Sequence, residues 1–366
     1  MRLTIENGMI VDVGNGPLRE IASNGVLTQV PEGGAVVPGF VDVHCHGAVG
    51  IDVNSADAED LRRVSAYLAR NGVTGWMPTL VPDTAENYGR TIAAIDEAMS
   101  KPVSGARILG VHYEGVFASP DMCGALRSEY FKEYDAPERL DELPLPENGS
   151  YMMTLAPEVY GGLDLIRELS KRGWVISIGH TAANAGNLDE ALKAGASHAT
   201  HFFNAMTGIH HRRKGVAGWV LTNDDVSIDI IADGKHIAPE MLSFAVRAKG
   251  VSKTSLISDS VAPTGLGDGC FRLWGREITV ENGITREADG GIAGSVITML
   301  DARGTMARLG FSEEELAELT ATNPCRLLGL SDRGEIEPGQ LADLVVIDPE
   351  GSVSEVFIEG RKLELN

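Results

Sequence analysis

The chain has 366 residues, of which 43% are hydrophobic and 23% are charged, so it can bury a large core. Its formal net charge of −21 argues against a general nucleic-acid or anionic-membrane binder, because both of those surfaces are themselves negative. The four cysteines (Cys45, Cys123, Cys270 and Cys325) are widely spaced, which is typical of a reduced, cytoplasmic protein. Residues 1–13 lack the pattern of a signal peptide, and no apolar run approaches the roughly 20 residues that span a bilayer.

Short alternating runs at both ends of the chain predict strands. Asn7-Gly8 between two of them is a strong hairpin signal, and Glu359-Gly360 marks a further turn. The runs cover residues 3–5, 9–11, 26–30, 35–37, 342–348 and 353–358. We therefore predict that residues 1–38 and 335–366 together form one small β domain.

Residues 39–334 alternate between strand-like and helix-like patterns. In the predicted helix 57–71, Leu61, Val64 and Leu68 share one apolar face, and Gly72 ends the helix. Further helices are predicted at 84–99, 162–172, 187–194 and 239–249. Eight strand candidates lie within 38–47 and at 73–81, 107–114, 151–156, 174–178, 198–203, 226–232 and 254–258. This alternation predicts an α/β fold, a (β/α)₈ barrel, with the small β domain as an accessory domain.

Two long connections interrupt the alternation. Residues 115–150 are Pro-rich, and residues 264–292 carry a hairpin-like insertion. Long connections of this kind are usually binding or lid elements. After them, Ser312 and Glu315 form a capping box that predicts a helix to about Leu328.

The stretch Pro38–Gly47 contains the first candidate metal ligands. His44 and His46 are two residues apart on a predicted strand, so they point to the same side and are suited to binding one transition metal. A pair of surface histidines in a turn is the simpler alternative for these two residues alone.

Further polar residues follow later strands of the predicted barrel, at the carboxyl ends where barrels carry their active sites. These residues are Glu114, His180, His201 and Asp259. Each alone has a structural explanation, such as a helix cap, an arginine partner or a turn. Together, four histidines and a carboxylate can hold one or two divalent ions, Zn²⁺ first and Fe²⁺ or Mn²⁺ as alternatives. Asp259 is then the candidate general base. We expect His198 to be structural and His112 to lie behind the ligands.

At these positions the chain resembles the amidohydrolase superfamily and, within it, the N-acetylglucosamine-6-phosphate deacetylase family. The resemblance covers nearly the full length. The matching segments are Pro38–Gly47, His112–Gly115, Gly179–Thr181, Thr200–Met206, Ala232–His236, Ser258-Asp259, Ala293–Ser295 and Asn323-Pro324.

The resemblance implies a (β/α)₈ TIM-like metallo-barrel with a small β-sandwich domain built from both ends of the chain. It also implies roles for individual residues. Glu114, His180 and His201 would hold the principal metal, and His44 and His46 could hold a second one. Asp259 matches the general base, and His236 matches the residue that polarises the acetyl carbonyl. Contacts to the sugar or phosphate map onto Ala125, Asn204, Ala205 and His236. The family is usually homodimeric, and the arginine matching Arg212 meets the substrate phosphate of the neighbouring subunit.

A basic cluster supports an anionic substrate on physical grounds. Residues 210–214, His-His-Arg-Arg-Lys, follow Asn204 on a loop of a strongly acidic chain. The planar fork of an arginine suits an anionic oxygen group. A solvated surface charge run is the alternative for this cluster.

One pocket position departs from the family pattern. After Gly124-Ala125, where the family usually has a histidine that contacts substrate, this chain has Leu126 and then Arg127. The catalytic set is intact, so the departure bears on the substrate, including its 6-substituent and its sugar epimer, and leaves hydrolysis itself unaffected.

The leading hypothesis is a metal-dependent deacetylase that acts on an N-acetylated amino sugar with an anionic 6-substituent, first of all N-acetylglucosamine 6-phosphate. Related alternatives are a 6-sulfated or epimeric N-acetyl hexosamine. More distant ones are N-acyl amino-acid hydrolysis, cyclic amide opening or deamination, and a barrel retained only for binding. The expected partner is a small-molecule substrate, with no nucleic acid and no membrane.

Overall fold

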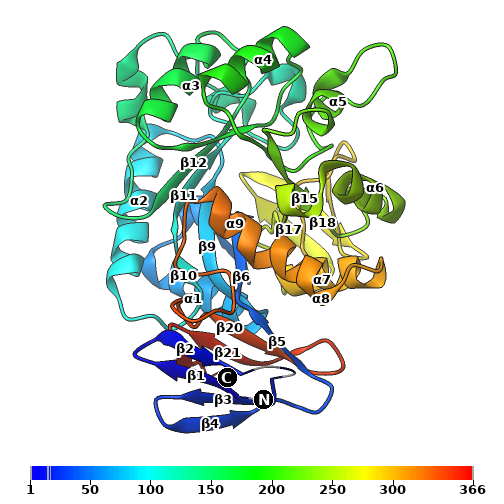
Figure 1. Cartoon of the computed structure of the whole chain (residues 1–366). Helices are drawn as coiled ribbons and strands as arrows, with labels where there is room; N and C mark the ends of the chain where they lie inside the picture. The colour runs from blue at the N-terminus through cyan, green and yellow to red at the C-terminus, as the bar shows by residue number, and fades with distance from the viewer. Residues whose placement is uncertain (1, 15, 17, 365–366) are drawn as a thin grey trace.

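The computed structural model describes residues 2–14, 16 and 18–364, so residues 1, 15, 17, 365 and 366 of the predicted β domain lie outside the described residues. A barrel makes up the upper part of Figure 1, and both ends of the described chain lie in strands beneath it. Within the described part of the chain, no helix combines the length and apolar character needed to cross a membrane.

Eight parallel strands form the barrel, and each pairs with the next in chain order. The last and first strands meet where the Asp259 amide donates to the His44 carbonyl (2.9 Å) and the His46 amide donates to the Ser260 carbonyl (2.8 Å). The strands are β6 (Phe40–Cys45), β9 (Val73–Leu80), β11 (Gly110–Glu114), β12 (Ser150–Leu155), β13 (Val175–Ile178), β14 (His198–Ala199), β15 (Ser227–Ile231) and β16 (Thr254–Ile257). The predicted fold class is confirmed.

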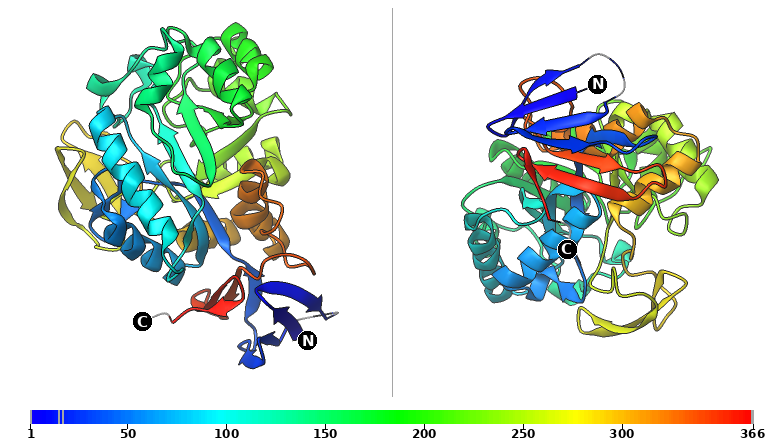
Figure 2. Two further views of the ribbon diagram at one scale, coloured as in Figure 1. Left: turned by 90° about the vertical axis from the view of Figure 1, so that its left-hand side faces the viewer. Right: turned by 90° about the horizontal axis from the view of Figure 1, so that it is seen from below.

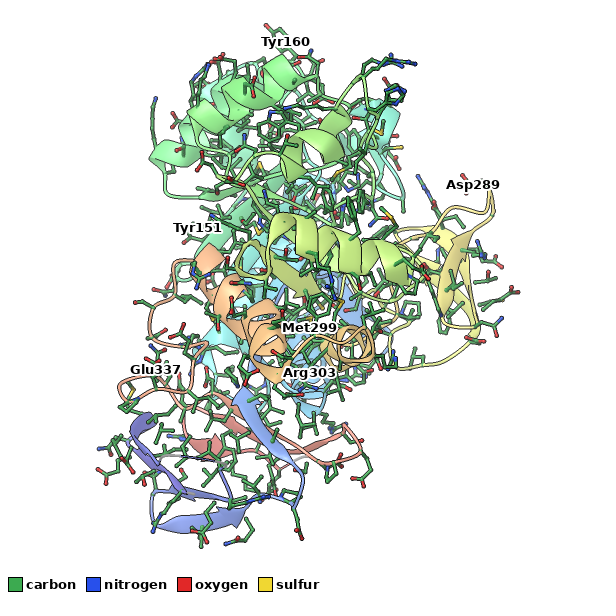
Figure 3. The ribbon with its side chains drawn as sticks, turned by 45° about the vertical axis from the view of Figure 1, so that its right-hand side comes forward. Tyr151, Tyr160, Asp289, Met299, Arg303 and Glu337 are labelled. Carbon is green, nitrogen blue, oxygen red and sulfur yellow. The ribbon has the colours of Figure 1, made fainter. Side chains whose placement is uncertain are left out.

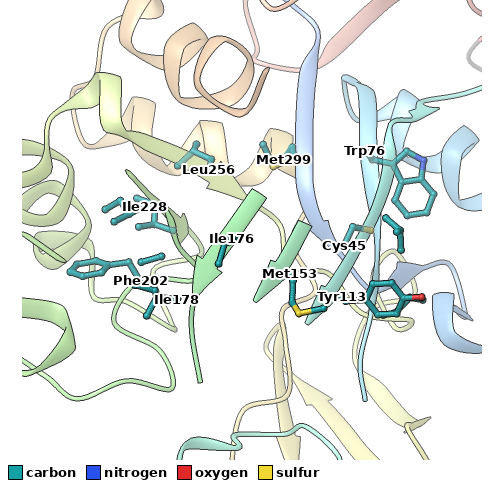
Figure 4. Packing of buried hydrophobic residues seen from close by; sticks show 14 of the residues in the cluster. Cys45, Trp76, Tyr113, Met153, Ile176, Ile178, Phe202, Ile228, Leu256 and Met299 are labelled. Atoms are coloured by element: carbon teal, nitrogen blue, oxygen red, sulfur yellow. The ribbon is translucent and has the colours of Figure 1, made fainter. Parts of the chain in front are cut away.

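Helices cover the outside of the barrel (Figures 1 and 2). Asp57 and Asp60 form the capping box that begins α1, and Leu61, Val64 and Leu68 are buried on its inner face as predicted. Trp76 of β9 is fully buried among these side chains and donates from Nε1 to Ser65 of α1 at 2.9 Å (Figure 4). The helices are α1 (Ala58–Arg70), α2 (Ala85–Ser100), α3 (Gly162–Lys171), α4 (Ala185–Ala194), α5 (Gly215–Leu221), α6 (Pro239–Lys249), α7 (Met299–Arg308), α8 (Glu313–Ala317) and α9 (Asn323–Leu327).

Several predicted elements differ from the structure. The strand predicted at 198–203 ends at Ala199, because the residues that follow turn through left-handed backbone at His201, Phe203 and Ala205. Helices α5 and α7 were not predicted. The helix predicted from the capping box at Ser312 is interrupted by a π-helical turn at Glu318–Thr322.

The strand predicted at 107–114 is broken into β10 (Arg107–Ile108) and β11. The break lies beside Gly110, whose φ is 148°. A Cβ atom at Gly110 would lie 1.9 Å from the carbonyl oxygen of Ser150, so only glycine allows the close approach to β12.

The strands from the two ends of the chain form two four-stranded sheets, ordered β2-β1-β3-β4 and β22-β21-β20-β5. Leu3 and Ile21 share a buried cluster with Leu344 and Phe357, so each end of the chain supplies half of one core. We propose residues 38 and 335 as the boundaries of this domain, because β5 continues directly into β6. The strands are β1 (Arg2–Glu6), β2 (Met9–Val13), β3 (Glu20–Ser23), β4 (Val26–Gln29), β5 (Ala35–Pro38), β20 (Leu344–Ile347), β21 (Val353–Ile358) and β22 (Arg361–Lys362).

The insertion between β16 and α7 is a three-stranded antiparallel meander, one strand more than the predicted hairpin. It consists of β17 (Gly269–Leu273), β18 (Arg276–Glu281) and β19 (Ile284–Glu287). Figure 3 shows Asp289 at its outer end, away from the barrel. Its inner side packs Leu273 and Ile278 against Val261, which directly follows the barrel. A smaller antiparallel pair, β7 (Gly47–Ala48) with β8 (Ile51–Asp52), follows β6.

Candidate metal centre

Six residues predicted from the sequence converge at the carboxyl edge of the barrel. His44 belongs to β6 and Glu114 is the last residue of β11. His180, His201 and Asp259 each lie two residues beyond the end of a strand, after β13, β14 and β16. Their exposed fractions are all small: His44 0%, His46 2%, Glu114 3%, His201 4%, His180 5% and Asp259 7%.

Left-handed backbone positions three of these side chains. The φ angles of His180, His201 and Asp259 are 48°, 33° and 48°, values that residues other than glycine seldom adopt. Each strained residue is held by a hydrogen bond from a neighbouring segment. The Ser119 amide donates to the His180 carbonyl (2.9 Å), and the His201 amide donates to the Asp229 carboxylate. These hydrogen bonds fix the residues after the strand ends, so that their side chains point into the mouth of the barrel.

The Glu114 carboxylate lies at the centre of the histidines. Its Oε1 is 3.1 Å from His180 Nε2, 3.0 Å from His201 Nε2 and 3.4 Å from His44 Nε2. Its Oε2 is 3.2 Å from His46 Nε2. One carboxylate therefore faces two pairs of imidazoles, an arrangement suited to bridging two ion positions.

Asp259 forms a second group of potential ligands with His44 and His46. Its Oδ1 lies 3.4 Å from His44 Nε2 and 3.3 Å from His46 Nε2. Two sets of three potential ligand atoms result, His44 with His46 and Asp259, and Glu114 with His180 and His201.

Bonds to backbone carbonyls orient two of the rings. His46 Nδ1 lies 3.1 Å from the Thr79 carbonyl oxygen, and His180 Nδ1 lies 2.9 Å from that of Met122. Because a carbonyl only accepts, Nδ1 carries a proton and Nε2 is the atom directed at the centre. His112 packs edge-on behind His44, with ring centroids 4.7 Å apart, as expected for a residue behind the ligands.

We call the six converging side chains the cage: His44, His46, Glu114, His180, His201 and Asp259. The charges of the cage favour the binding of a cation. Burial opposes the ionisation of Glu114, but the surrounding imidazoles hold its pKa well below its ordinary value. Burial lowers the pKa of His46, yet the carboxylates of Asp259 and Glu114 raise it to about 10. His44 Nε2 and His46 Nε2 face each other at 3.0 Å, which two lone pairs tolerate only with a proton or a cation close by. The donor set therefore fits one or two divalent metal ions.

A cavity of about 200 Å³ opens above the cage. Of the predicted substrate residues, Ala125, Asn204, Ala205 and His236 line it. Arg212 does not line it, and lies with the rest of residues 208–214 in an exposed loop. The five residues of the predicted basic cluster are thus outside the cavity of their own subunit.

Leu126, which replaces the usual histidine, lines the same cavity and is only 3% exposed. Its side chain covers Gly115, where a Cβ atom would lie 2.1 Å from the Leu126 Cδ1. The next residue, Arg127, forms an ion pair with Asp83 at 2.6 Å and does not line this cavity.

Two further residues of the site were missed by the sequence prediction. Asp233 accepts from His236 Nδ1 at 2.7 Å, and although burial raises the pKa of Asp233, the bond from His236 holds it below its ordinary value. An aspartate three residues before the histidine was the available signal. Trp274 lines the cavity from the turn between β17 and β18, and its ring lies edge-on to His46 with centroids 5.3 Å apart. The insertion was noted in the sequence, but nothing there singled out this residue.

His198, predicted to be structural, is fully buried below the cage. Its Nε2 lies 2.9 Å from Asp229 Oδ2, and the other oxygen of Asp229 holds the His201 amide. His198 therefore supports the strained backbone of His201 through Asp229.

Comparisons with known proteins agree with this geometry. The family model described as the amidohydrolase family matches residues 35–363. The chain is 35% identical over 340 residues to an N-acetylglucosamine-6-phosphate deacetylase of Bacillus subtilis, covering 91% of this chain and 85% of the relative. It is 30% identical to an N-acetylgalactosamine-6-phosphate deacetylase of Escherichia coli O157:H7, covering 98% and 97%.

A solved structure agrees over the same length. An N-acetyl-D-glucosamine-6-phosphate deacetylase variant from Mycobacterium smegmatis, in complex with N-acetyl-D-glucosamine-6-phosphate, superposes with a TM-score of 0.86 at 31% identity, covering 98% of this chain and 93% of that chain. This chain belongs to the amidohydrolase family and, within it, to the N-acetylglucosamine-6-phosphate deacetylases.

Proposed function

We propose that this enzyme hydrolyses the N-acetyl amide of N-acetylglucosamine 6-phosphate and releases acetate and the free amino sugar. The observation that carries the proposal is the carboxylate-centred histidine cage at the floor of a cavity that also holds Asn204 and His236. A reducing, cytoplasmic location is part of the proposal and rests on the spacing of the cysteines alone.

The metal would be held by Glu114, His180 and His201, with His44 and His46 able to hold a second ion. A divalent cation in such a cage polarises an acyl carbonyl and lowers the pKa of water to about 7. Imidazole and carboxylate ligands suit Zn²⁺, which we propose as the metal, with Fe²⁺ and Mn²⁺ as alternatives.

Asp259 is the proposed base. Burial raises its pKa, but His44 and His46 outweigh burial and hold the pKa below its ordinary value, so the side chain is an ionised proton acceptor. It takes a proton from the attacking water and delivers it to the departing amine. His236, whose Nδ1 is held by the Asp233 carboxylate, donates from Nε2 to the acetyl oxygen as negative charge develops there.

The sugar would lie over the loops after β14 and β11, where Asn204, Ala205 and Ala125 line the cavity. Leu126 offers no side-chain hydrogen bond on this side of the cavity, so the substrate lacks a partner there that a histidine would provide. The similarity to a relative that acts on the galactosamine epimer makes N-acetylgalactosamine 6-phosphate the second candidate substrate.

Acetate release tests this proposal. The purified protein, loaded with Zn²⁺, is supplied in parallel with the 6-phosphates of N-acetylglucosamine and N-acetylgalactosamine and with N-acetylglucosamine 6-sulfate. We expect turnover of a 6-phosphate, and a loss of about a thousandfold in kcat for Asp259→Asn at full metal content. No acetate from any of these substrates, or full turnover by Asp259→Asn, would overturn the proposal.

We also propose a homodimer in which Arg212 reaches the neighbouring active site. The exposed position of Arg212, outside the cavity of its own subunit, supports this arrangement. Mixed dimers of Arg212→Ala and Asp259→Asn subunits discriminate between the two arrangements. If Arg212 serves the neighbour, one site in each mixed dimer has both intact residues and activity returns on mixing. If Arg212 serves its own subunit, no site is complete and mixing restores nothing.

A further inference from the structure

Trp274 separates the metal cavity from a second, polar cavity. The second cavity lies above the ends of β6, β9 and β11, and Trp274 is the one described residue that lines both. On the metal side the indole contacts His46, with ring centroids 5.3 Å apart at an interplanar angle of 81°. The other side holds polar residues, among them Asp52, Asn54, Asp83, Arg127 and Arg272. Among the described residues, Trp274 is therefore the wall that the two cavities share.

The backbone of Trp274 is unusual for its residue type. It lies in the hairpin turn between Leu273 and Arg276 with a φ of 49°, followed by Gly275 with a φ of 83°. Asn, Asp and Gly are the residues that favour the first position of such a turn, and bulky residues there are outliers. The nearby turn at Asn282-Gly283 uses the favoured pair. The turn chemistry does not explain a tryptophan at this place, whereas the contact with His46 does.

The position of Trp274 around the barrel mouth indicates which part of the substrate it meets. Under the proposed function, on which this step depends, the sugar lies over the loops after β14 and β11, which carry Asn204 and Ala125, while His236 meets the acetyl oxygen. The amide carbonyl must reach the cage. The acyl substituent then points away from the sugar, toward His46 and the indole that lies against it.

We propose that Trp274 is a specificity-determining residue that closes the acyl side of the pocket and limits the substrate to short N-acyl groups. An acetyl methyl fits between His46 and the indole. A longer acyl chain collides with the indole plane, and the second cavity would provide room for such a chain if the plane were removed.

The test compares kcat/KM for the N-acetyl, N-propionyl and N-butyryl forms of glucosamine 6-phosphate. For the wild type we expect kcat/KM to fall by about tenfold or more from acetyl to butyryl. For Trp274→Ala we expect the butyryl-to-acetyl ratio to rise by about tenfold or more, and for Trp274→Phe a smaller rise. Leu266→Ala is the matched control, because Leu266 is an apolar residue of the same insertion that is 49% exposed and lines neither cavity.

Each outcome has a defined meaning. An unchanged ratio in a folded Trp274→Ala protein with full metal content would overturn the assignment, since a platform for the sugar ring would lower kcat/KM equally for all three substrates. Reduced metal content with an unchanged ratio would show that the indole only supports His46, and would also overturn it. No turnover of the acetyl substrate by the wild type would instead overturn the proposed function and the acyl assignment with it.

Discussion

Left-handed backbone occurs in both parts of the molecule, but different residues adopt it in each. In the β-sandwich it occurs at Asn7, Asn24 and Glu359, each directly followed by a glycine in a hairpin turn. At the strand ends that carry the cage it occurs at His180, His201, Phe203, Ala205 and Asp259, and none of these is followed by glycine, whereas Val49 in the nearby β7–β8 turn precedes Gly50.

The comparison shows that the same conformation serves two purposes. In the sandwich it reverses the chain, and asparagine followed by glycine adopts this conformation at little cost in free energy. At the mouth it directs histidine and aspartate side chains, at a cost on the order of 1–2 kcal/mol per residue that the surrounding barrel must offset. Trp274 combines the two patterns, since it stands before a glycine in a hairpin turn and yet faces the cage.

Metal removal should have the largest effect on activity. Any effect on structure should be confined to the barrel. Chelation of the ions is expected to lower kcat by about a thousandfold or more, because Lewis acidity of several kcal/mol is lost. The sandwich has its own core and none of the cage residues, so far-UV circular dichroism should change little. Zn²⁺ should restore acetate release. Full activity in protein shown to be metal-free by elemental analysis would contradict the assignment of the cage.

Glu114→Gln should be the next most damaging change. The amide brings a neutral group and two N–H donors to a position that faces four Nε2 atoms, so we expect low metal content and kcat/KM lower by about a hundredfold or more. Asp259→Asn is the matched carboxylate change and should retain the ion at Glu114, His180 and His201 while losing turnover. Equal metal content in the two variants would show that Glu114 is not the central ligand.

Asp229→Asn should have an intermediate effect, because Asp229 does not line the metal cavity and acts on the site through the left-handed backbone of His201, whose amide it binds. We expect kcat/KM to fall by about tenfold to a hundredfold, with weaker metal binding in a competition titration. An unchanged metal affinity together with unchanged kcat/KM would show that the strand end keeps its conformation without this anchor.

The sequence predicted the residues of the cage but not the backbone conformation that orients their side chains. His44 and His46 obey strand alternation, so a period of two was sufficient to place them on one side. For His201 the same reasoning extended a strand to Phe203, whereas the structure ends it at Ala199. The apolar residues Phe202 and Phe203 resemble strand residues in sequence, and the Asp229 bond that turns the chain comes from the next strand.

Long-range contacts also explain what was missed outside the cage. Trp274 reaches the site because a meander folds back onto the barrel at Val261, a contact that no local pattern encodes. By contrast, the hairpin at Asn7-Gly8 and the capping box at Ser312 depend on neighbouring residues alone, and both agree with the structure.

The sandwich turns should show the smallest effect, confined to stability. Asn24 has a φ of 49° between β3 and β4, and Asn24→Ala should cost about 1 kcal/mol and lower the midpoint of thermal unfolding by about 2 °C. Asn24→Gly should change the midpoint little, because glycine adopts this conformation freely. Both variants should retain wild-type kcat/KM, since the turn contributes nothing to the cavity. If Asn24→Ala instead lowered kcat/KM without lowering stability, the left-handed turn of the sandwich would be coupled to the active site. Left-handed backbone would then not serve independent purposes in the two regions.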